Sequence, residues 1–217
     1  MQILAHRGIW KSDSEKNSKA ALSSSLKAGF GVETDIRDRN GQLVISHDPA
    51  IEDCWLAADF FALASELNTS APLALNIKSD GLHRLIQEAV TEFRLENYFC
   101  FDMSFPDLRQ YSGIQLAFFC RLSEYETMPQ LKEFSKGVWL DAFDDEWYLQ
   151  TPLSKFVSMY SQVAIVSPEL HKRKHDKVWQ WVLDGIGDIG TNTNRVMLCT
   201  DYPFEAKRYF EAQGIII

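Results

Sequence analysis

The sequence predicts an α/β fold: a single (β/α)8 TIM barrel that spans residues 1–217 as one domain and carries a β-hairpin extension after strand two. Short runs rich in β-branched and aromatic residues alternate with amphipathic stretches, the pattern of repeated strand–helix units. About eight units fit the chain and the last strand is followed by a last helix, which favours a closed barrel over an open sheet. With 217 residues and 46% hydrophobic content, the chain can bury one sizeable core.

The expected strands and helices alternate along the whole chain. The predicted strands cover 3–7, 31–37, 73–78, 98–102, 115–120, 137–141, 163–167 and 196–200. The predicted helices cover 17–28, 56–67, 82–94, 106–112, 129–135, 152–161, 174–184 and 203–213. Single Gly, Pro and Asn positions separate these segments, and the sequence shows neither a linker nor a low-complexity stretch.

The second strand is expected to continue into a hairpin, because the turn sequence D-R-N-G at 38–41 leads into a second strand-like run at 42–46. A two-residue turn would place Thr34 opposite His47 and direct this histidine away from the carboxylates of strand two. A three-residue loop with a left-handed Gly41 would instead place Glu33 opposite His47. We predict the three-residue loop.

Charge and composition argue against several classes of protein. The formal net charge of -8 and the pI near 5.1 are unfavourable for binding nucleic acid or anionic lipid. No apolar stretch approaches the ~20 residues of a membrane span, and the run at 3–5 is too short for a signal peptide. The four cysteines form no C-x-x-C pair and are expected to be reduced. We therefore expect a cytoplasmic protein without stable membrane insertion, of undetermined oligomeric state.

Polar residues gather at the C-terminal ends of the predicted strands, where barrels of this kind carry their active sites. These residues are His6, Arg7, Glu33, Asp35, His47, Asn76 and Lys78. Trp10, just after the first strand, is expected to line the pocket. Glu169 follows the seventh strand and is a further candidate for contact with a substrate.

Glu33 and Asp35 are two residues apart on one strand, so both carboxylates point to the same face. Two such carboxylates repel each other unless a cation lies between them, and oxygen ligands of this kind suit Mg²⁺ or Ca²⁺. The alternative is that one carboxylate pairs with Arg7 or Arg37 in a structural network. The presence of two histidines, His6 and His47, close to these carboxylates favours the metal site.

The two histidines point to acid–base chemistry. Cleavage of a phosphodiester requires one group that activates the nucleophile and another that protonates the leaving alkoxide, and His6 and His47 can each do either near neutral pH. Arg7 and Lys78 supply fixed positive charge, which either binds a phosphate or neutralises the carboxylates.

Several strings resemble the glycerophosphodiester phosphodiesterases: H-R-G at 6–8, G-F-G-V-E-T-D-I-R at 29–37, N-G-Q-L-V at 40–44 and H-D-P at 47–49. The likeness is close over about the first 50 residues and resumes at L-N-I-K, 75–78, and C-T-D-Y-P, 199–203. It implies a phospholipase-C-like barrel in which His6 and His47 form the acid–base pair. It also implies that Glu33 and Asp35 bind a divalent cation and that Arg7 and Lys78 contact the phosphate of a small diester.

One departure from this family concerns the cation. Asn76 stands where the family usually has a third carboxylate, and its neutral amide oxygen would hold Mg²⁺ or Ca²⁺ more weakly. A second hypothesis is therefore a catalytically weak or silent barrel that binds a phosphorylated ligand. A sugar-phosphate isomerase on the same fold would leave both histidines unexplained.

Overall fold

The structure is a computed structural model, and it describes residues 1–50, 54–67 and 70–217. The chain divides into two compact units. The N-terminal unit comprises Ala5–Phe118, and the C-terminal unit comprises Met1–Leu4 with Phe119–Ile217. The first strand, β1 (Gln2–His6), passes from one unit into the other. Within the described residues, no helix has the length and apolar character needed to cross a membrane.

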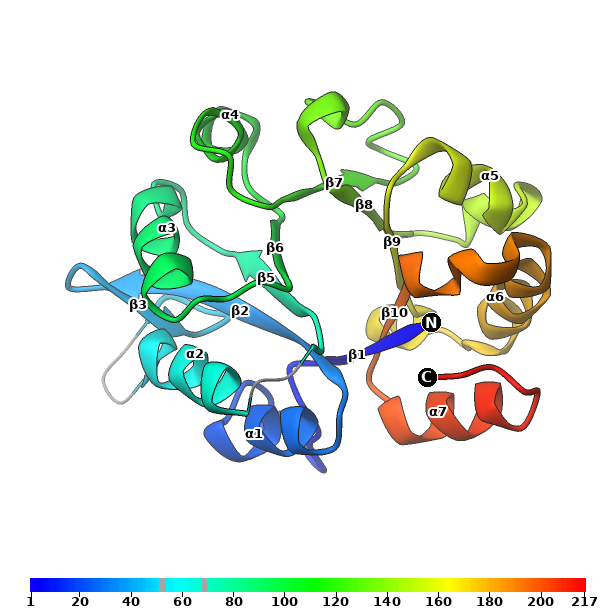
Figure 1. The fold of residues 1–217 in the computed structure, drawn as a ribbon, viewed down its shortest axis with the longest axis horizontal. Helices are drawn as coiled ribbons and strands as arrows, with labels where there is room; N and C mark the ends of the chain where they lie inside the picture. The colour runs from blue at the N-terminus through cyan, green and yellow to red at the C-terminus, as the bar shows by residue number, and fades with distance from the viewer. Residues whose placement is uncertain (51–53, 68–69) are drawn as a thin grey trace. The chain divides into compact units, whose positions relative to one another are not determined.

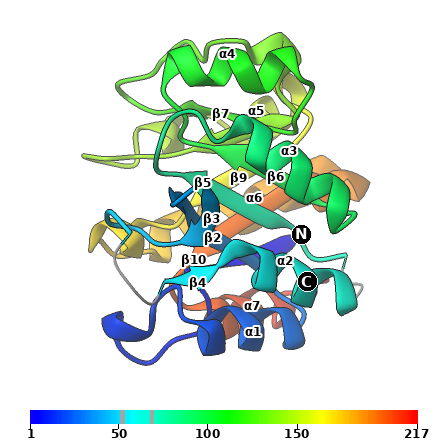
Figure 2. The same ribbon diagram turned by 90° about the vertical axis from the view of Figure 1, so that its left-hand side faces the viewer.

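The N-terminal unit is built on three parallel strands with β5 between β2 and β6. Its strands are β2 (Gly31–Arg39), β3 (Gln42–Ile45), β4 (Trp55–Leu56), β5 (Leu73–Ile77) and β6 (Tyr98–Phe101). Its helices are α1 (Lys19–Lys27), α2 (Ala57–Glu66), α3 (His83–Glu92) and α4 (Phe105–Gly113), with a short 3-10 helix, η1 (Asp13–Glu15). Figures 1 and 2 show α1, α2 and α3 following one another along one side of these strands. Leu22, Phe60, Phe61 and Ile86 are fully buried there and form the core.

The hairpin between β2 and β3 has a two-residue turn, so the predicted three-residue loop is wrong. Arg39 pairs with Gln42, and both residues of the turn are left-handed, with φ of 51° at Asn40 and 77° at Gly41. Asn tolerates this conformation almost as glycine does, and a turn with two left-handed residues matches the twist of the strands. The pairing continues to Ser46, whose N–H donates to the Asp35 carbonyl at 3.1 Å.

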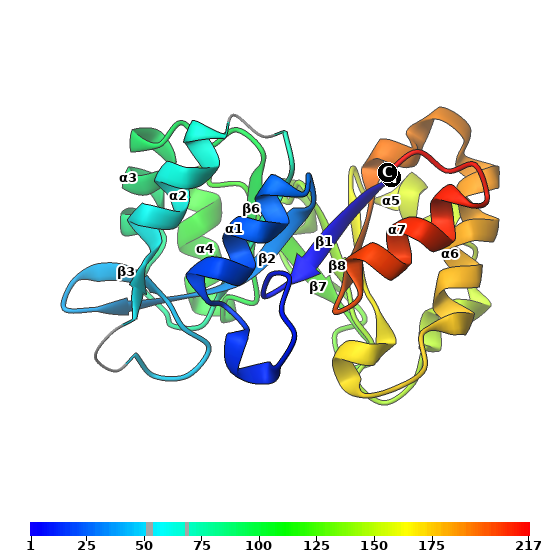
Figure 3. The same ribbon diagram turned by 90° about the horizontal axis from the view of Figure 1, so that it is seen from below.

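The C-terminal unit holds four parallel strands in the order β7-β8-β9-β10. They are β7 (Phe119–Leu122), β8 (Gly137–Leu140), β9 (Val163–Val166) and β10 (Val196–Thr200). The helices are α5 (Leu153–Met159), α6 (Asp176–Ile189) and α7 (Pro203–Glu211). Short 3-10 helices are η2 (Lys132–Phe134), η3 (Trp147–Gln150), η4 (Pro168–His171) and η5 (Gly190–Arg195). Figure 3 shows α6 beside α7, where the rings of Trp179 and Phe210 lie 6.1 Å apart.

Two predicted elements differ most from the structure. The strand expected at 115–120 begins only at Phe119, although Phe118 already forms a single parallel bridge with Cys100. The helix expected at 129–135 is reduced to η2. Pro129 lacks an N–H donor, and Leu131 is left-handed with φ of 55°, so an α-helix cannot run through this segment.

Candidate active site

The turn that leaves β1 is pinned between β2 and α1. The Arg7 N–H donates to the Glu33 carbonyl at 2.9 Å, and the Asn17 N–H donates to the Arg7 carbonyl at 2.9 Å. A Cβ at Gly8 would lie 2.6 Å from the carbonyl carbon of Ala21, and φ at Gly8 is +93°. Only glycine combines that conformation with so close an approach to α1. The turn therefore holds Arg7 directly over the buried carboxylates of β2.

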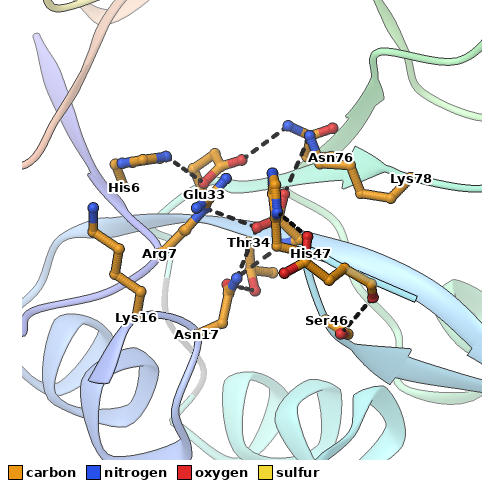
Figure 4. A network of polar contacts seen from close by, with 12 residues as sticks. His6, Arg7, Lys16, Asn17, Glu33, Thr34, Ser46, His47, Asn76 and Lys78 are labelled. Atoms are coloured by element: carbon orange, nitrogen blue, oxygen red, sulfur yellow. Dashed lines mark hydrogen bonds and ion pairs between the residues drawn. The ribbon is translucent and has the colours of Figure 1, made fainter. Parts of the chain in front are cut away.

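Asp35 is the most heavily engaged residue of the site. Its partners Arg7, Asn17 and Lys78 are labelled in Figure 4. Its carboxylate is fully buried and lies 2.8 Å from Arg7 Nε and 3.4 Å from Lys78 Nζ. The Asn17 side-chain amide donates to Asp35 Oδ2 at 2.7 Å and accepts from the buried Thr34 hydroxyl at 2.8 Å. The pairing of Asp35 with Arg7, which the sequence left as an alternative, is thus present.

Glu33 lies in the same network but is less well neutralised. It is 2% exposed, its Oε1 accepts from the Asn76 amide at 3.3 Å, and its Oε2 lies 3.9 Å from His6 Nε2. Burial raises the pKa of Glu33, and the negative charge of Asp35 raises it further, against the opposing effects of His6 and the nearby cations. An additional positive charge here would therefore stabilise the ionised form.

Three buried oxygens of the site accept no hydrogen bond from the described residues: Glu33 Oε2, Asp35 Oδ1 and Asn76 Oδ1. Asp35 and Asn76 are direct partners in the pairing of β2 with β5. Among the described residues, no three His, Cys, Asp or Glu groups come together to hold a metal, so the amide of Asn76 is needed to complete a set of three. Two carboxylates and one amide are hard oxygen ligands, and this donor set fits Mg²⁺ or Ca²⁺.

His47 lies on the loop after β3, and its side chain is 48% exposed. Its Nδ1 lies 3.0 Å from Asp48 Oδ1, and its carbonyl accepts from Arg37 Nε at 2.9 Å. Strand parity does not decide its direction, because β3 ends two residues earlier at Ile45. His47 lines a cavity of about 1070 Å³ together with Arg7 and Asn17. Even with the two-residue turn, His47 therefore lines the same cavity as Arg7 and Asn17, which both contact Asp35.

Two other predicted site residues have mainly structural contacts. The Trp10 indole N–H donates to the His6 carbonyl at 2.9 Å, and Lys16 Nζ lies 4.3 Å above its ring. Trp10 thus supports the backbone of His6. Glu169 lies in the C-terminal unit, where its carboxylate accepts from the Ser167 and Thr200 hydroxyls and from the Asp201 N–H at 3.1 Å.

The sequence-based site omitted Asn17 and Thr34, although the structure joins both to Asp35. Asn17 carried one usable signal, since it precedes Ser18, the N-cap of α1, and so had to lie near the turn after β1. No such signal marked Thr34 in the sequence. It lies between Glu33 and Asp35 on β2, so strand alternation directs its side chain to the opposite face from the two carboxylates.

No family model matches the sequence, and no curated protein matches it significantly. Solved structures do match its fold. A glycerophosphoryl diester phosphodiesterase from Parabacteroides distasonis aligns with a TM-score of 0.68 at 12% identity, covering 98% of this chain and 86% of its own. This chain therefore has the (β/α)8 barrel fold of that structure. A phosphodiesterase from Oleispira antarctica, in complex with the product sn-glycerol-3-phosphate, aligns with a TM-score of 0.67 at 14% identity, covering 97% of each chain.

A third structure with this fold is a Ca²⁺-dependent phosphatidylinositol-specific phospholipase C from Streptomyces antibioticus. It aligns with a TM-score of 0.55 at 11% identity and covers 95% of each chain. Identities this low establish the architecture, and the chemistry has to be argued from the residues of the site.

Proposed function

We propose that this protein cleaves phosphodiesters, with a glycerophosphodiester or a related polar-alcohol diester as substrate. The observation that carries the proposal is the set of buried oxygens without hydrogen bonds on Glu33, Asp35 and Asn76, next to two cationic side chains. Among the described residues, Asp35 Oδ1 has only the ion pair with Lys78 at 3.4 Å. Burying a polar atom without a hydrogen bond is costly, so these oxygens call for a ligand that satisfies them.

Each charged residue has a role in this proposal. Arg7 and Lys78 attract the phosphate and stabilise negative charge on its oxygens. Glu33, Asp35 and Asn76 would hold Mg²⁺ or Ca²⁺, which, when bound, withdraws charge from a phosphoryl group. His47 is open to the cavity, where it can exchange a proton with an alcohol oxygen of the diester. His6 lies against Glu33, which keeps its imidazole directed at the buried centre.

The pair of histidines provides the proton transfers that the reaction needs. One imidazole takes the proton of the attacking hydroxyl or water, and the other donates a proton to the leaving alkoxide. The barrels that share this fold support the proposal, because one was solved with sn-glycerol-3-phosphate as product and another depends on Ca²⁺.

A second candidate function is binding of a phosphorylated ligand without turnover. It is favoured by Asn76, which is neutral, and by the pairing of both Arg7 and Lys78 with Asp35. This pairing reduces the positive charge that is available to a substrate.

Turnover of glycerophosphodiesters, followed by ³¹P NMR in the presence of Mg²⁺, Ca²⁺ or EDTA, tests the proposal. His6→Ala and His47→Ala should fold normally and lose about 10²-fold or more of the rate, the usual contribution of a general acid or base. His83→Ala is the matched control, since His83 pairs with Asp107 and is not part of this network. Full activity in both active-site variants would remove the acid–base assignment.

Asn76→Asp tests the cation separately. A third carboxylate should lower the Mg²⁺ or Ca²⁺ concentration that gives half of the maximal rate. If no cation changes the rate or the melting temperature while a phosphodiester still raises the melting temperature, the binding function is correct instead.

A further inference from the structure

The peptide group that joins His6 to Arg7, in the N-terminal unit, is hydrogen-bonded on both sides. Its N–H, which belongs to Arg7, donates to the Glu33 carbonyl at 2.9 Å. Its carbonyl, which belongs to His6, accepts from the Trp10 indole N–H at 2.9 Å. Because a peptide group is planar, these two bonds fix the plane from which both side chains leave the main chain. The indole of Trp10 therefore acts on both His6 and Arg7.

Arg7 needs such support, because its φ of 55° lies in the left-handed region that residues with a Cβ disfavour. A conformation of this kind persists where its surroundings hold it, and here the Arg7 carbonyl also accepts from the Asn17 N–H at 2.9 Å. The Arg7 side chain is held separately by Asp35 at 2.8 Å. His6 Nε2 lies 3.9 Å from Glu33 Oε2, beyond hydrogen-bond distance. Loss of the indole bond should therefore displace the imidazole of His6 more than the guanidinium of Arg7.

Trp10 is itself held by the residues that follow it. Lys16 Nζ lies 4.3 Å from the centroid of its ring, and a cation over an indole face is attracted to it. The same ammonium group lies 2.9 Å from Asp13 Oδ1, on the 3-10 helix η1. The backbone N–H of Lys11 donates to Glu15 Oε2 at 2.8 Å and connects the start of this segment to the end of η1. The indole is thus fixed by its own segment on one side and bonded to the end of β1 on the other.

We infer that Trp10 is a positioning residue that fixes the peptide group between His6 and Arg7 and so directs the His6 imidazole. The inference rests on the proposed function and adds to it a residue that acts through another. A general acid or base has to lie within about 2.6–3.2 Å of the atom with which it exchanges a proton. A displacement of about 1 Å can lower a rate by about 10²-fold. A small rotation of this peptide group is therefore enough to slow turnover while the affinity for the diester stays the same.

Trp10→Phe tests the inference, because it keeps an aromatic ring and removes the N–H donor. With glycerophosphoethanolamine and Mg²⁺ or Ca²⁺, kcat should fall by about tenfold. KM should stay within about twofold of the native value, since Arg7 keeps its ion pair with Asp35. Trp181→Phe is the matched control, because the Trp181 indole N–H donates to the Thr151 carbonyl at 3.0 Å in the C-terminal unit. It loses the same kind of bond and should keep the native kcat.

Hydrogen exchange of the Arg7 amide, followed by NMR, tests the same bond without turnover. In Trp10→Phe this amide should exchange at least about fivefold faster relative to the Val32 amide, which donates to the Pro72 carbonyl at 2.9 Å in the same unit. In Trp181→Phe the ratio of the two exchange rates should remain that of the native protein.

Native kcat in Trp10→Phe, a change in KM alone, or an unchanged exchange ratio would each overturn the inference. If the native protein cleaves no diester under any cation, the proposed function fails, and the exchange measurement alone decides the inference. Faster exchange of the Arg7 amide in Trp10→Phe then supports the inference, and an unchanged ratio overturns it.

Discussion

Replacing Asn17 by alanine should destabilise the protein by about 3 kcal/mol, because the amide serves two buried groups at once. The bond from its Nδ2 to Asp35 Oδ2 is 2.7 Å long, and a hydrogen bond to a charged group contributes about 1.5–3 kcal/mol. Arg7 also contacts Asp35, which keeps this loss near the lower limit. The Thr34 hydroxyl, fully buried and 2.8 Å from Asn17 Oδ1, would lose its acceptor at a cost of about 1–3 kcal/mol.

Urea unfolding of four proteins separates the two contributions: the native chain, Asn17→Ala, Thr34→Val and the double variant. When Thr34 is already valine, no hydroxyl is left without an acceptor. In that background Asn17→Ala should lower the free energy of unfolding by at least about 1 kcal/mol less than it does in the native chain. A total loss below about 1 kcal/mol for Asn17→Ala, or the same loss in both backgrounds, would refute the assignment of these two bonds.

Three further predictions concern groups outside the charged network. Gly8→Ala should lower the free energy of unfolding in urea by at least about 2 kcal/mol, because its Cβ would lie 2.6 Å from a backbone atom. The control is Gly29→Ala, where φ is +82° and the Cβ would point into open space, and this change should cost about 1 kcal/mol. Equal losses in the two variants would contradict the close approach at Gly8. Tyr111→Phe should leave the melting temperature unchanged or raise it, since this buried hydroxyl has no hydrogen-bond partner among the described residues; a lower melting temperature would indicate a bound water. Native protein at pH 8 should react rapidly with a thiol reagent at Cys54 alone, because the other three cysteines are buried. Burial also raises the pKa of the Cys100 and Cys120 thiols. A second rapidly reacting thiol would contradict this prediction.

The alternation of strands and helices could be predicted because most segments carry a clear periodicity. The predicted strand at 196–200 coincides with β10, and the one at 31–37 starts with β2. The helix at 129–135 could not be excluded by apolar spacing alone, since the left-handed conformation of Leu131 is a property of the folded loop. The hairpin register was missed for a different reason: Asn40 permits both turn lengths, and the twist of the strands decides between them.

Most of the candidate site could also be located from the sequence, because polar residues at the ends of β1, β2 and β5 stand out from apolar strands. The partners of these residues could not be read in the same way. Side-chain directions in the loops decide which cation neutralises Asp35. They also decide whether Trp10 faces the cavity or supports His6. Glu169 shows the limit of arguing from strand order, since its position after β9 is as expected while its carboxylate bonds to Ser167 and Thr200.

The pairing of Asp35 with Arg7 and Lys78 has a consequence for how ligands bind. Apart from the histidines, the two carboxylates of the site are matched in formal charge by these two cations. A phosphodiester anion would leave this set with an excess negative charge, and a divalent cation would leave it with an excess of two positive charges. Bound together they nearly compensate each other. Under the proposed function, binding of the cation and binding of the diester would then be thermodynamically linked, and each would raise the affinity of the site for the other by the same factor.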